Sequence, residues 1–264
     1  MHNRNLFWGI LITFIGLFLL CNQMLDVNLG KFLFPVILIL FGVWFLVAPS
    51  IRKGEMSEEH IYIPLDGASE ADIRLNFFAG KLNLHALDSS SDLIAGTCFC
   101  NLEESVSRHG DRLKVKLEQQ FDFFNKFSPM WGQIGSSWNI GLSRHIPLKL
   151  SLKGGAEDAC LDLTLLKIQE LHLKTGASAT QINLPAEAGS TFVSIAVGAA
   201  SVNIRIPEGV AGRIRSKESA IASIKVDTIR FPSSNSGFQS DDYDTSTNKV
   251  DIVIKAGVGS VEIH

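Results

Sequence analysis

The sequence predicts a membrane-anchored all-β protein, in which a hairpin of two transmembrane helices precedes a β-solenoid or β-roll. Two observations predict this class. Two apolar runs without a charged residue, 6–21 and 32–48, lie at the start of the chain. Behind them, short runs of alternating apolar and polar residues recur with a period of about 22 residues. We therefore expect a helical hairpin over residues 1–53, a charged connector over 54–60 and a β domain over 61–264.

The apolar runs are long enough to cross a bilayer. A spanning helix needs roughly 20 residues, and with their tolerant flanks the two runs extend over about 6–25 and 32–49. A cleaved signal peptide is one alternative, but no A-x-A-like site follows the first run, whereas a second apolar run does. A buried hairpin in a soluble protein is another, but neither run has a polar face.

Charges beside the two runs predict their orientation. Arg4 precedes the first run, Arg52 and Lys53 follow the second, and the link between the runs carries only Lys31. Because cytoplasmic flanks of membrane helices are enriched in lysine and arginine, we expect both termini and the β domain in the cytoplasm.

Three glycines mark the helix surfaces that would pack in the hairpin. Gly9 and Gly16 share one helix face, and Gly42 aligns with Gly16 when the runs are compared. Small residues let membrane helices approach closely. These glycines therefore predict either packing between the two helices or docking of a helix from a partner protein.

Glycines also punctuate the repeats of the β domain. Gly154, Gly176 and Gly198 are spaced 22 residues apart, and each separates two alternating runs. The same pattern surrounds Gly80 and Gly257. Glycine at such a turn provides either a positive φ or close approach of the backbones of neighbouring coils. One repeat cannot bury its own apolar face, so the coils are expected to stack.

Two stretches interrupt the repeats. The first, 121–138, is rich in aromatic residues and is predicted either to cap the β domain or to contact a membrane surface or partner. The second, 231–249, is rich in serine and aspartate and is predicted to be a solvated loop. The residues assigned to the aromatic patch are Phe123, Phe124, Phe127, Trp131 and Trp138.

The composition contains no recognisable catalytic chemistry. The chain of 264 residues has a net charge of −3 and scattered basic residues, which argues against a nucleic-acid partner. No phosphate-binding glycine loop, G-x-S-x-G or H-E-x-x-H motif occurs, and the acids 241–244 do not match a calcium loop. We therefore predict that the protein is not an enzyme and binds no cofactor or metal.

The four cysteines do not form a disulfide framework. We expect them to be reduced apolar fillers, since a bridge between Cys98 and Cys100 would be strained. A bridge from either of them to Cys160 is the geometric alternative.

Two parts of the chain carry a family resemblance. The patterns W-G…I-G-L-F-L-L and F-G-V-W-F-L resemble the LiaI/LiaF-like transmembrane region of bacterial envelope proteins. The coils 171–185 and 193–207, with the closing V-D-I-V-I-K-A-G-V-G-S-V-E-I, resemble the toast-rack β domain that follows that region. This domain is similar to the LiaF-type cell wall-active antibiotics response domain and to adhesin-like β domains.

The resemblance implies a membrane protein of the cell-envelope stress response. Described members modulate a sensor histidine kinase, commonly by inhibition, so the implied partners are the lipid bilayer and such a kinase. The alternative is an adhesin-like structural scaffold that forms homo-oligomers through its end coils, because solenoid ends expose unpaired strand edges.

Overall fold

The computed structural model describes residues 38, 58–89, 91–120, 136–217, 221–234 and 237–264. The chain divides into two compact units, of which the first comprises Met1–Gly54 with Phe127–Pro129. The predicted hairpin, with Gly9, Gly16 and Gly42, lies outside the described residues. Within the described ranges, no helix is both long enough and apolar enough to cross a bilayer.

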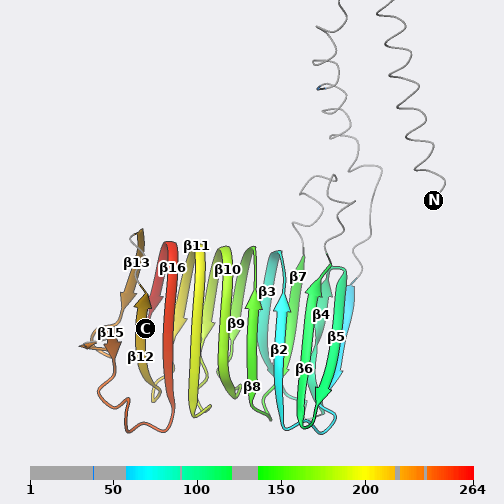
Figure 1. Ribbon diagram of the computed structural model, residues 1–264, viewed down its shortest axis with the longest axis horizontal. Coiled ribbons are helices and arrows are strands. Elements are labelled where there is room, and N and C mark those ends of the chain that lie inside the picture. The colour runs from blue at the N-terminus through cyan, green and yellow to red at the C-terminus, as the bar shows by residue number, and fades with distance from the viewer. Residues whose placement is uncertain (1–37, 39–57, 90, 121–135, 218–220, 235–236) are drawn as a thin grey trace, which may run out of the picture. The chain divides into compact units, whose positions relative to one another are not determined.

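The second unit is a flattened β-solenoid of two layers (Figure 1). The long strands β10 (Ile168–Asn183), β11 (Ser190–Arg205) and β16 (Lys249–Ile263) contribute their first halves to one layer and their second halves to the other. In the first layer the remaining strands are β5 (Leu102–His109), β6 (Arg112–Gln119), β2 (Glu70–Asn76), β8 (Leu148–Lys153), β12 (Ala211–Lys217), β15 (Gly237–Gln239) and β14 (Ser233–Ser234). In the second they are β1 (Glu58–Pro64), β4 (Asp92–Phe99), β7 (Ser137–Ser143), β3 (Ala79–Leu87), β9 (Ala156–Asp162) and β13 (Ile221–Val226).

Each long strand changes layer at a glycine. In β10, after the irregularity between Ile168 and Glu170, the buried side chains before Gly176 are at odd positions, such as Leu171 and Leu173. After the glycine they are at even positions, Thr180 and Ile182. A strand exposes successive side chains to opposite faces, so this change of phase keeps the apolar residues inside as the chain crosses from one layer to the other.

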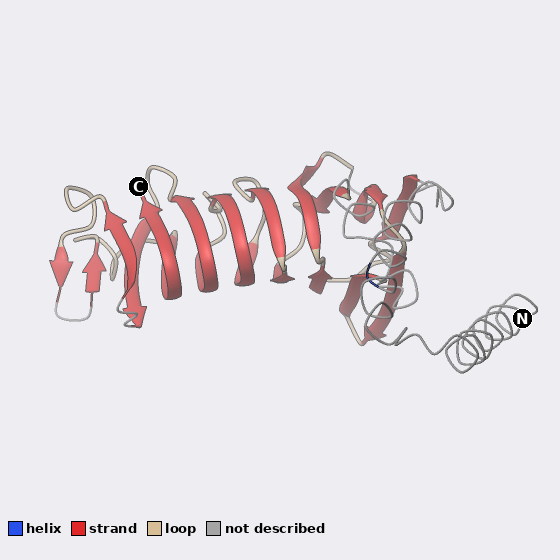
Figure 2. Cartoon of the chain, turned by 90° about the horizontal axis from the view of Figure 1, so that it is seen from above, coloured by secondary structure: helices blue, strands red, loops and turns tan. Residues whose placement is uncertain are grey.

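Parallel pairing of the coils aligns the buried side chains in ladders, and Figure 2 shows the coils following one another in a row. One ladder of the first layer consists of Ile73, Leu150, Leu171, Val193, Ile252 and Ile214. One of the second layer consists of Leu84, Leu161, Ile182, Ile204 and Ile263. All of them are buried, so the two layers enclose one core between them. The predicted β-solenoid-like fold is confirmed.

The order of the coils in space differs from their order in the sequence. The last strand, β16, lies between β11 and the coil formed by β12 and β13. At the other end, the coil of β6 and β7 lies outside that of β2 and β3. The C-terminal segment is therefore an internal coil with partners on both sides.

The described part of the polar stretch 231–249 has many exposed residues, as predicted, but it is more than a solvated loop because two of its aromatic residues pack on the C-terminal end of the solenoid. Phe231 and Tyr243 are buried, and Arg213 lies over the Tyr243 ring at 4.0 Å. Arg230, just before this stretch, donates hydrogen bonds to the carbonyl oxygens of Ile206, Pro207 and Val210. Solenoids need such terminal caps because the last coil has no neighbour to cover its core.

The cysteines also differ from expectation. Cys98 and Cys100 are joined in a disulfide, with a Cα–Cα distance of 5.5 Å. This distance is normal for a bridge and is available because β4 ends at Phe99, so the chain bends between the two residues. Cys160 is a free, exposed cysteine of β9 rather than a buried filler.

Candidate functional site

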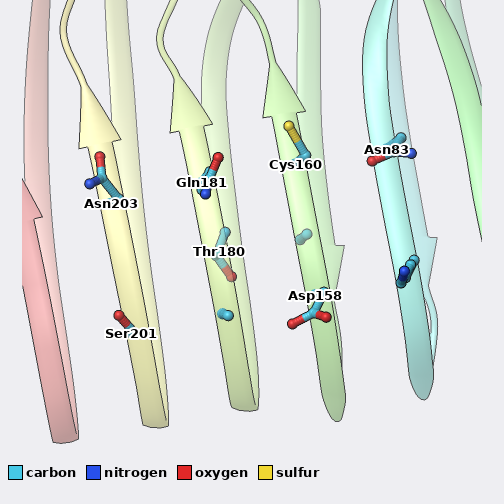
Figure 3. Close-up of a pocket in the computed structure, with 10 residues that line it drawn as sticks. Asn83, Asp158, Cys160, Thr180, Gln181, Ser201 and Asn203 are labelled. Carbon is cyan, nitrogen blue, oxygen red and sulfur yellow. The ribbon is translucent and has the colours of Figure 1, made fainter.

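The outer surface of the second layer carries a row of carboxamide side chains (Figure 3). Parallel register places Asn139, Asn83, Cys160, Gln181 and Asn203 side by side on five neighbouring strands. All five side chains are exposed, because the residues before and after each of them point into the core. We call this set the amide row. Neighbouring strands lie about 4.8 Å apart, so the row repeats hydrogen-bonding groups at that interval.

A shallow, open groove of about 410 Å³ follows this surface. Besides members of the amide row, it is lined by Thr180 and Ser201 and by Lys81 and Asp158, which are register partners on β3 and β9. Because Lys81 and Asp158 carry opposite charges, they leave the groove close to neutral. The groove therefore offers many hydrogen-bond donors and acceptors but no enclosed apolar pocket of the kind that holds a small molecule.

Candidate metal ligands and reactive side chains are few on this surface. Among the described residues, no three His, Cys, Asp or Glu side chains are grouped so that they could hold a metal ion. The groove does contain the free thiol of Cys160, which lies between Asn83 and Gln181 in the row. What the surface can do is bind an extended partner through a regular series of hydrogen bonds.

The outer surface of the first layer is different, because opposite charges pair across its strands. Lys149 Nζ lies 2.5 Å from Glu170 Oε1, and Arg112 Nε lies 2.7 Å from Glu70 Oε1. Hydrogen bonds from these cations lower the pKa of both carboxyl groups. Such exposed pairs contribute little to stability, and their charges are already satisfied within the chain.

One carboxyl group is buried at the edge where the coils change layer. Glu157 of β9 is 5% exposed, and the Thr175 hydroxyl donates a hydrogen bond to its Oε1, whereas Oε2 has no partner. Burial raises the pKa of Glu157, and the hydrogen bond from Thr175 offsets part of this effect. The side chain packs beneath Gly154, where a Cβ atom would lie 2.4 Å from its Oε2. It is a feature of the core rather than of the groove.

The glycines predicted at the repeat turns lie along this same edge. A Cβ on Gly176, Gly198 or Gly257 would lie 2.6–2.8 Å from the carbonyl oxygen of the preceding coil. Close approach of backbones, rather than a positive φ, is therefore the reason for glycine at these three positions. In the coil of β8 and β9, the glycine that stacks is Gly155, while the predicted Gly154 lies over Glu157.

At Gly80, both a positive φ and a close backbone contact require glycine. Its φ is +126°, and a Cβ would lie 2.0 Å from the carbonyl oxygen of Ser136. Gly259 of the last coil has the same combination, with a φ of +132° and the carbonyl oxygen of Ala200 at 1.9 Å. The sequence pattern did not single out Gly259, although it follows Gly257 by two residues.

Trp138 does not belong to an aromatic surface patch, contrary to the prediction. It is 1% exposed in β7, pairs with Leu82 in register and packs against the Phe77 ring at 6.2 Å. The aromatic insertion is thus shorter than 121–138, because strand β7 begins at Ser137. Phe123, Phe124, Phe127 and Trp131 lie outside the described residues.

Sequence reasoning missed the amide row. A signal for it was present, because Asn83, Gln181 and Asn203 occupy the same outward position in the second run of three repeats. The signal is weak in the sequence since Cys160 takes that position in the repeat between them, and only the register shows that the four are neighbours.

Comparison with known proteins identifies the fold. No curated protein matches the sequence. A crystal structure titled "putative cell adhesion protein" from Clostridium sporogenes ATCC 15579 superposes with a TM-score of 0.67 at 21% identity, covering 78% of this chain and 98% of that one. A "putative adhesin" from Bacteroides fragilis NCTC 9343 covers 79% of this chain and 97% of its own, at 9% identity and a TM-score of 0.30.

A family assignment rests on the longer part of the β domain. Residues 52–205, more than half of the chain, match the family model described as the N-terminal domain of toast_rack, DUF2154. This range runs from the connector through the coils formed by β2 to β11. The chain therefore belongs to the toast-rack family.

Proposed function

We propose that this protein is a non-enzymatic binding scaffold of the bacterial cell envelope. Its N-terminal hairpin anchors it in the membrane, and its β domain holds a partner protein against the amide row. The observation that carries this proposal is the row itself, a regular series of exposed hydrogen-bonding groups on a layer with a continuous buried core. The sheet fixes the spacing of these side chains, so binding a partner does not require the backbone to become ordered.

Within this class, we favour a role in the cell-envelope stress response. The resemblance of the N-terminal runs to the LiaI/LiaF-like region supports modulation of a sensor histidine kinase. The hairpin would contact the kinase's membrane helices through Gly9, Gly16 and Gly42, and the β domain would contact its cytoplasmic part. The charges that flank the apolar runs support a cytoplasmic β domain.

A genetic complementation experiment tests this role. A strain that lacks the gene is complemented with the wild-type chain or with a variant carrying N83A, Q181A and N203A, and induction of envelope-stress genes is measured after cell-wall damage. A matched variant carries S151A, H172A and S194A on the outer surface of the first layer. We expect altered induction in the deletion and amide-row strains but not in the matched strain. Unchanged induction in the deletion strain would refute the regulatory role.

The strand edges favour a second candidate, a scaffold that assembles with copies of itself. In the described part of the chain, β13 pairs only with β16, and β5 pairs only with β6. Such unpaired edges can accept a strand from another chain, and the structural neighbour titled a putative cell adhesion protein is compatible with a structural role. Light scattering of the purified full chain tests it: self-assembly predicts oligomers that dissociate in a variant carrying S223K on β13. A monomeric wild-type chain would exclude this candidate.

A further inference from the structure

The edge at which the coils change layer exposes an apolar strip. Beside the stacked glycines, the register aligns Ala156, Ala177, Ala199 and Val258 on consecutive coils, and all four are exposed. Val258 is 51% exposed. We call this strip, with its glycines, the glycine edge. It is flat, because close contact between neighbouring backbones excludes larger side chains from the glycine positions.

Two phenylalanines extend the apolar character of this edge. Phe78 lies in the turn between β2 and β3, where its carbonyl oxygen accepts a hydrogen bond from the Ala156 amide, and it is 43% exposed. Phe99 ends β4 at the same edge and is 38% exposed. The chain thus exposes three large apolar side chains here, although large apolar groups are normally buried.

A row of lysines borders the strip on the first layer. Lys153, Lys174 and Lys255 share one register row, in which Ala196 lies between Lys174 and Lys255. Asn76 and Glu118 occupy the same row on the other side of Lys153. All three lysines are exposed, and within the described ranges none of them forms an ion pair. This contrasts with the middle of the same layer, where Lys149 and Arg215 are paired with acids.

The acidic residues near the edge offset only part of this charge. Glu118 pairs with Lys116 and also interacts electrostatically with Lys153, Asp158 lies opposite Lys81 on the second layer, and Glu157 is turned into the core. The other acids that the structure describes at this level, Glu58, Glu59, Glu103 and Glu104, belong to the outermost strands β1 and β5. Along the central coils the glycine edge is therefore apolar in the middle and positive on one side.

The chain enters the β domain at this edge. Glu58, the first residue of β1, pairs with Phe99, and the register through β4 and β7 places both at the level of Lys81, next to Gly80. Only residues 49–57 separate β1 from the second apolar run of the sequence. Nine residues span at most about 32 Å when fully extended. An edge on so short a tether stays close to the surface of any bilayer that holds the apolar runs.

From these observations we infer that the glycine edge docks on a bilayer surface containing anionic lipids. This inference rests on the membrane anchoring in the proposed function. The lysine row binds headgroup phosphates, which attract basic residues within a Debye length of the surface. The alanines, Val258, Phe78 and Phe99 contact the boundary between headgroups and acyl chains, where partly apolar surfaces are favoured. Docking leaves the amide row, on the outer surface of the second layer, accessible to a partner.

Depth-dependent fluorescence quenching of the full chain tests the inference. Cys21 and Cys160 are replaced by serine, and the buried Cys98 and Cys100 by alanine. An environment-sensitive dye is then attached to A199C at the glycine edge or to E187C in the loop between β10 and β11 at the opposite edge. The labelled chains are reconstituted into vesicles of phosphatidylcholine, with or without phosphatidylglycerol, that contain a lipid-attached quencher. We expect quenching at A199C but not at E187C, and stronger quenching when phosphatidylglycerol is present.

Charge reversal then tests the lysine row. The variant K153E, K174E and K255E should lose the additional quenching that phosphatidylglycerol causes at A199C. A matched variant, R144E, K167E and R205E, changes the charge equally away from the glycine edge and should keep it. Circular dichroism verifies that both variants fold, and alternative lysine-to-glutamine changes replace any that does not.

The outcomes separate the inference from the proposed function. Extraction of the unlabelled chain from membranes by alkaline carbonate would overturn the anchoring, and with it the inference. Retention of the chain, with A199C quenched no more than E187C in anionic vesicles, would overturn the inference alone. Equal quenching at A199C in the charge-reversed and matched variants, in vesicles that contain phosphatidylglycerol, would show that the lysine row does not bind the headgroups. This result would also contradict the inference.

Discussion

Substitution of Gly176 by alanine should destabilise the β domain by opening the stack of coils. The added Cβ would lie 2.6 Å from the carbonyl oxygen of Gly155, and atoms of this kind do not approach within 3.0 Å. The neighbouring atom belongs to the backbone, so it cannot rotate away. The carbonyl oxygen of Gly176 itself lies under Gly198, so a shift of this coil also disturbs the next one.

The cost can be estimated from this contact. Overpacking in a well-packed region costs about 1–3 kcal/mol, and the upper value is appropriate because two coils must move. For a domain of about 200 residues, 3 kcal/mol lowers the melting temperature by roughly 6–12 °C. Gly189 provides a control, since its φ is +74° but a Cβ there would meet nothing within 4 Å. Alanine at position 189 should therefore destabilise the domain only through backbone strain, by about 1–2 kcal/mol.

Thermal unfolding followed by circular dichroism measures both variants in the same detergent. The expected result is a larger decrease in melting temperature for G176A than for G189A. An equal or smaller decrease for G176A would refute the explanation that close backbone contact, rather than conformation, requires glycine along this edge. It would also remove the physical reason for the flatness of the glycine edge.

Three further predictions concern the core, the C-terminus and the cysteines. Because burial raises the pKa of Glu157, its contribution to stability is complete below the ordinary pKa of 4.5 and is lost as the pH rises through the folded-state value. E157Q should therefore be more stable than the wild type at pH 8, by about 1.4 kcal/mol for each unit by which the pKa of Glu157 is raised, but not at pH 4. Urea unfolding at both pH values measures this, and equal stability of the two proteins at pH 8 would contradict it. Truncation after Asn248 removes β16 and should abolish cooperative unfolding, because this strand lies between β11 and β12. A cooperative unfolding transition in the truncated chain would argue against the internal position of β16. If the β domain is cytoplasmic, Cys98 and Cys100 should be reduced in cells, since thiols are kept reduced in the cytoplasm. Differential alkylation followed by mass spectrometry measures this. Detection of the Cys98–Cys100 bridge in cells would instead place the domain outside the cytoplasm.

The fold could be predicted from the sequence because each coil repeats the same local pattern. The run around Leu171 and Leu173 and the run around Val193 and Ile195 both alternate and both end near a glycine. Alternation determines which side chains are buried, and stacking aligns them without further information. The choice between Gly154 and Gly155 was ambiguous, since only the contact with Gly176 shows which glycine lies in the stack.

The order of the coils could not be predicted in the same way. Each coil exposes two similar edges, so the local pattern fits a sequential order, with β12 and β13 beside β11 and β16 at the end, as well as the observed order with β16 between them. Pairing between distant parallel strands leaves no local sequence signal. The cap was missed for a related reason: the stretch 231–249 has the composition of a loop, and only Phe231 and Tyr243 indicate that it packs on the core.

Trp138 shows how composition can conceal a strand. It follows a run of aromatic residues and was grouped with them, although S-W-N-I-G-L-S already alternates. In the structure, Trp138, Ile140 and Leu142 are all buried, and Asn139 between them joins the amide row. The alternation of apolar and polar residues therefore predicts burial here better than the aromatic content of the stretch does.

The regular fold also explains how one domain can have surfaces with different properties. Each coil contributes one side chain to every register row, so a substitution such as Gln181 to another exposed residue changes the amide row without altering the buried ladder at Ile182. The lysine row and the amide row lie on different layers and are separated by the glycine edge. A partner bound to the amide row would then not compete with lipid for the lysines. This separation suits the membrane-tethered scaffold that we propose, because such a domain would lie against the bilayer and still present one surface to a partner.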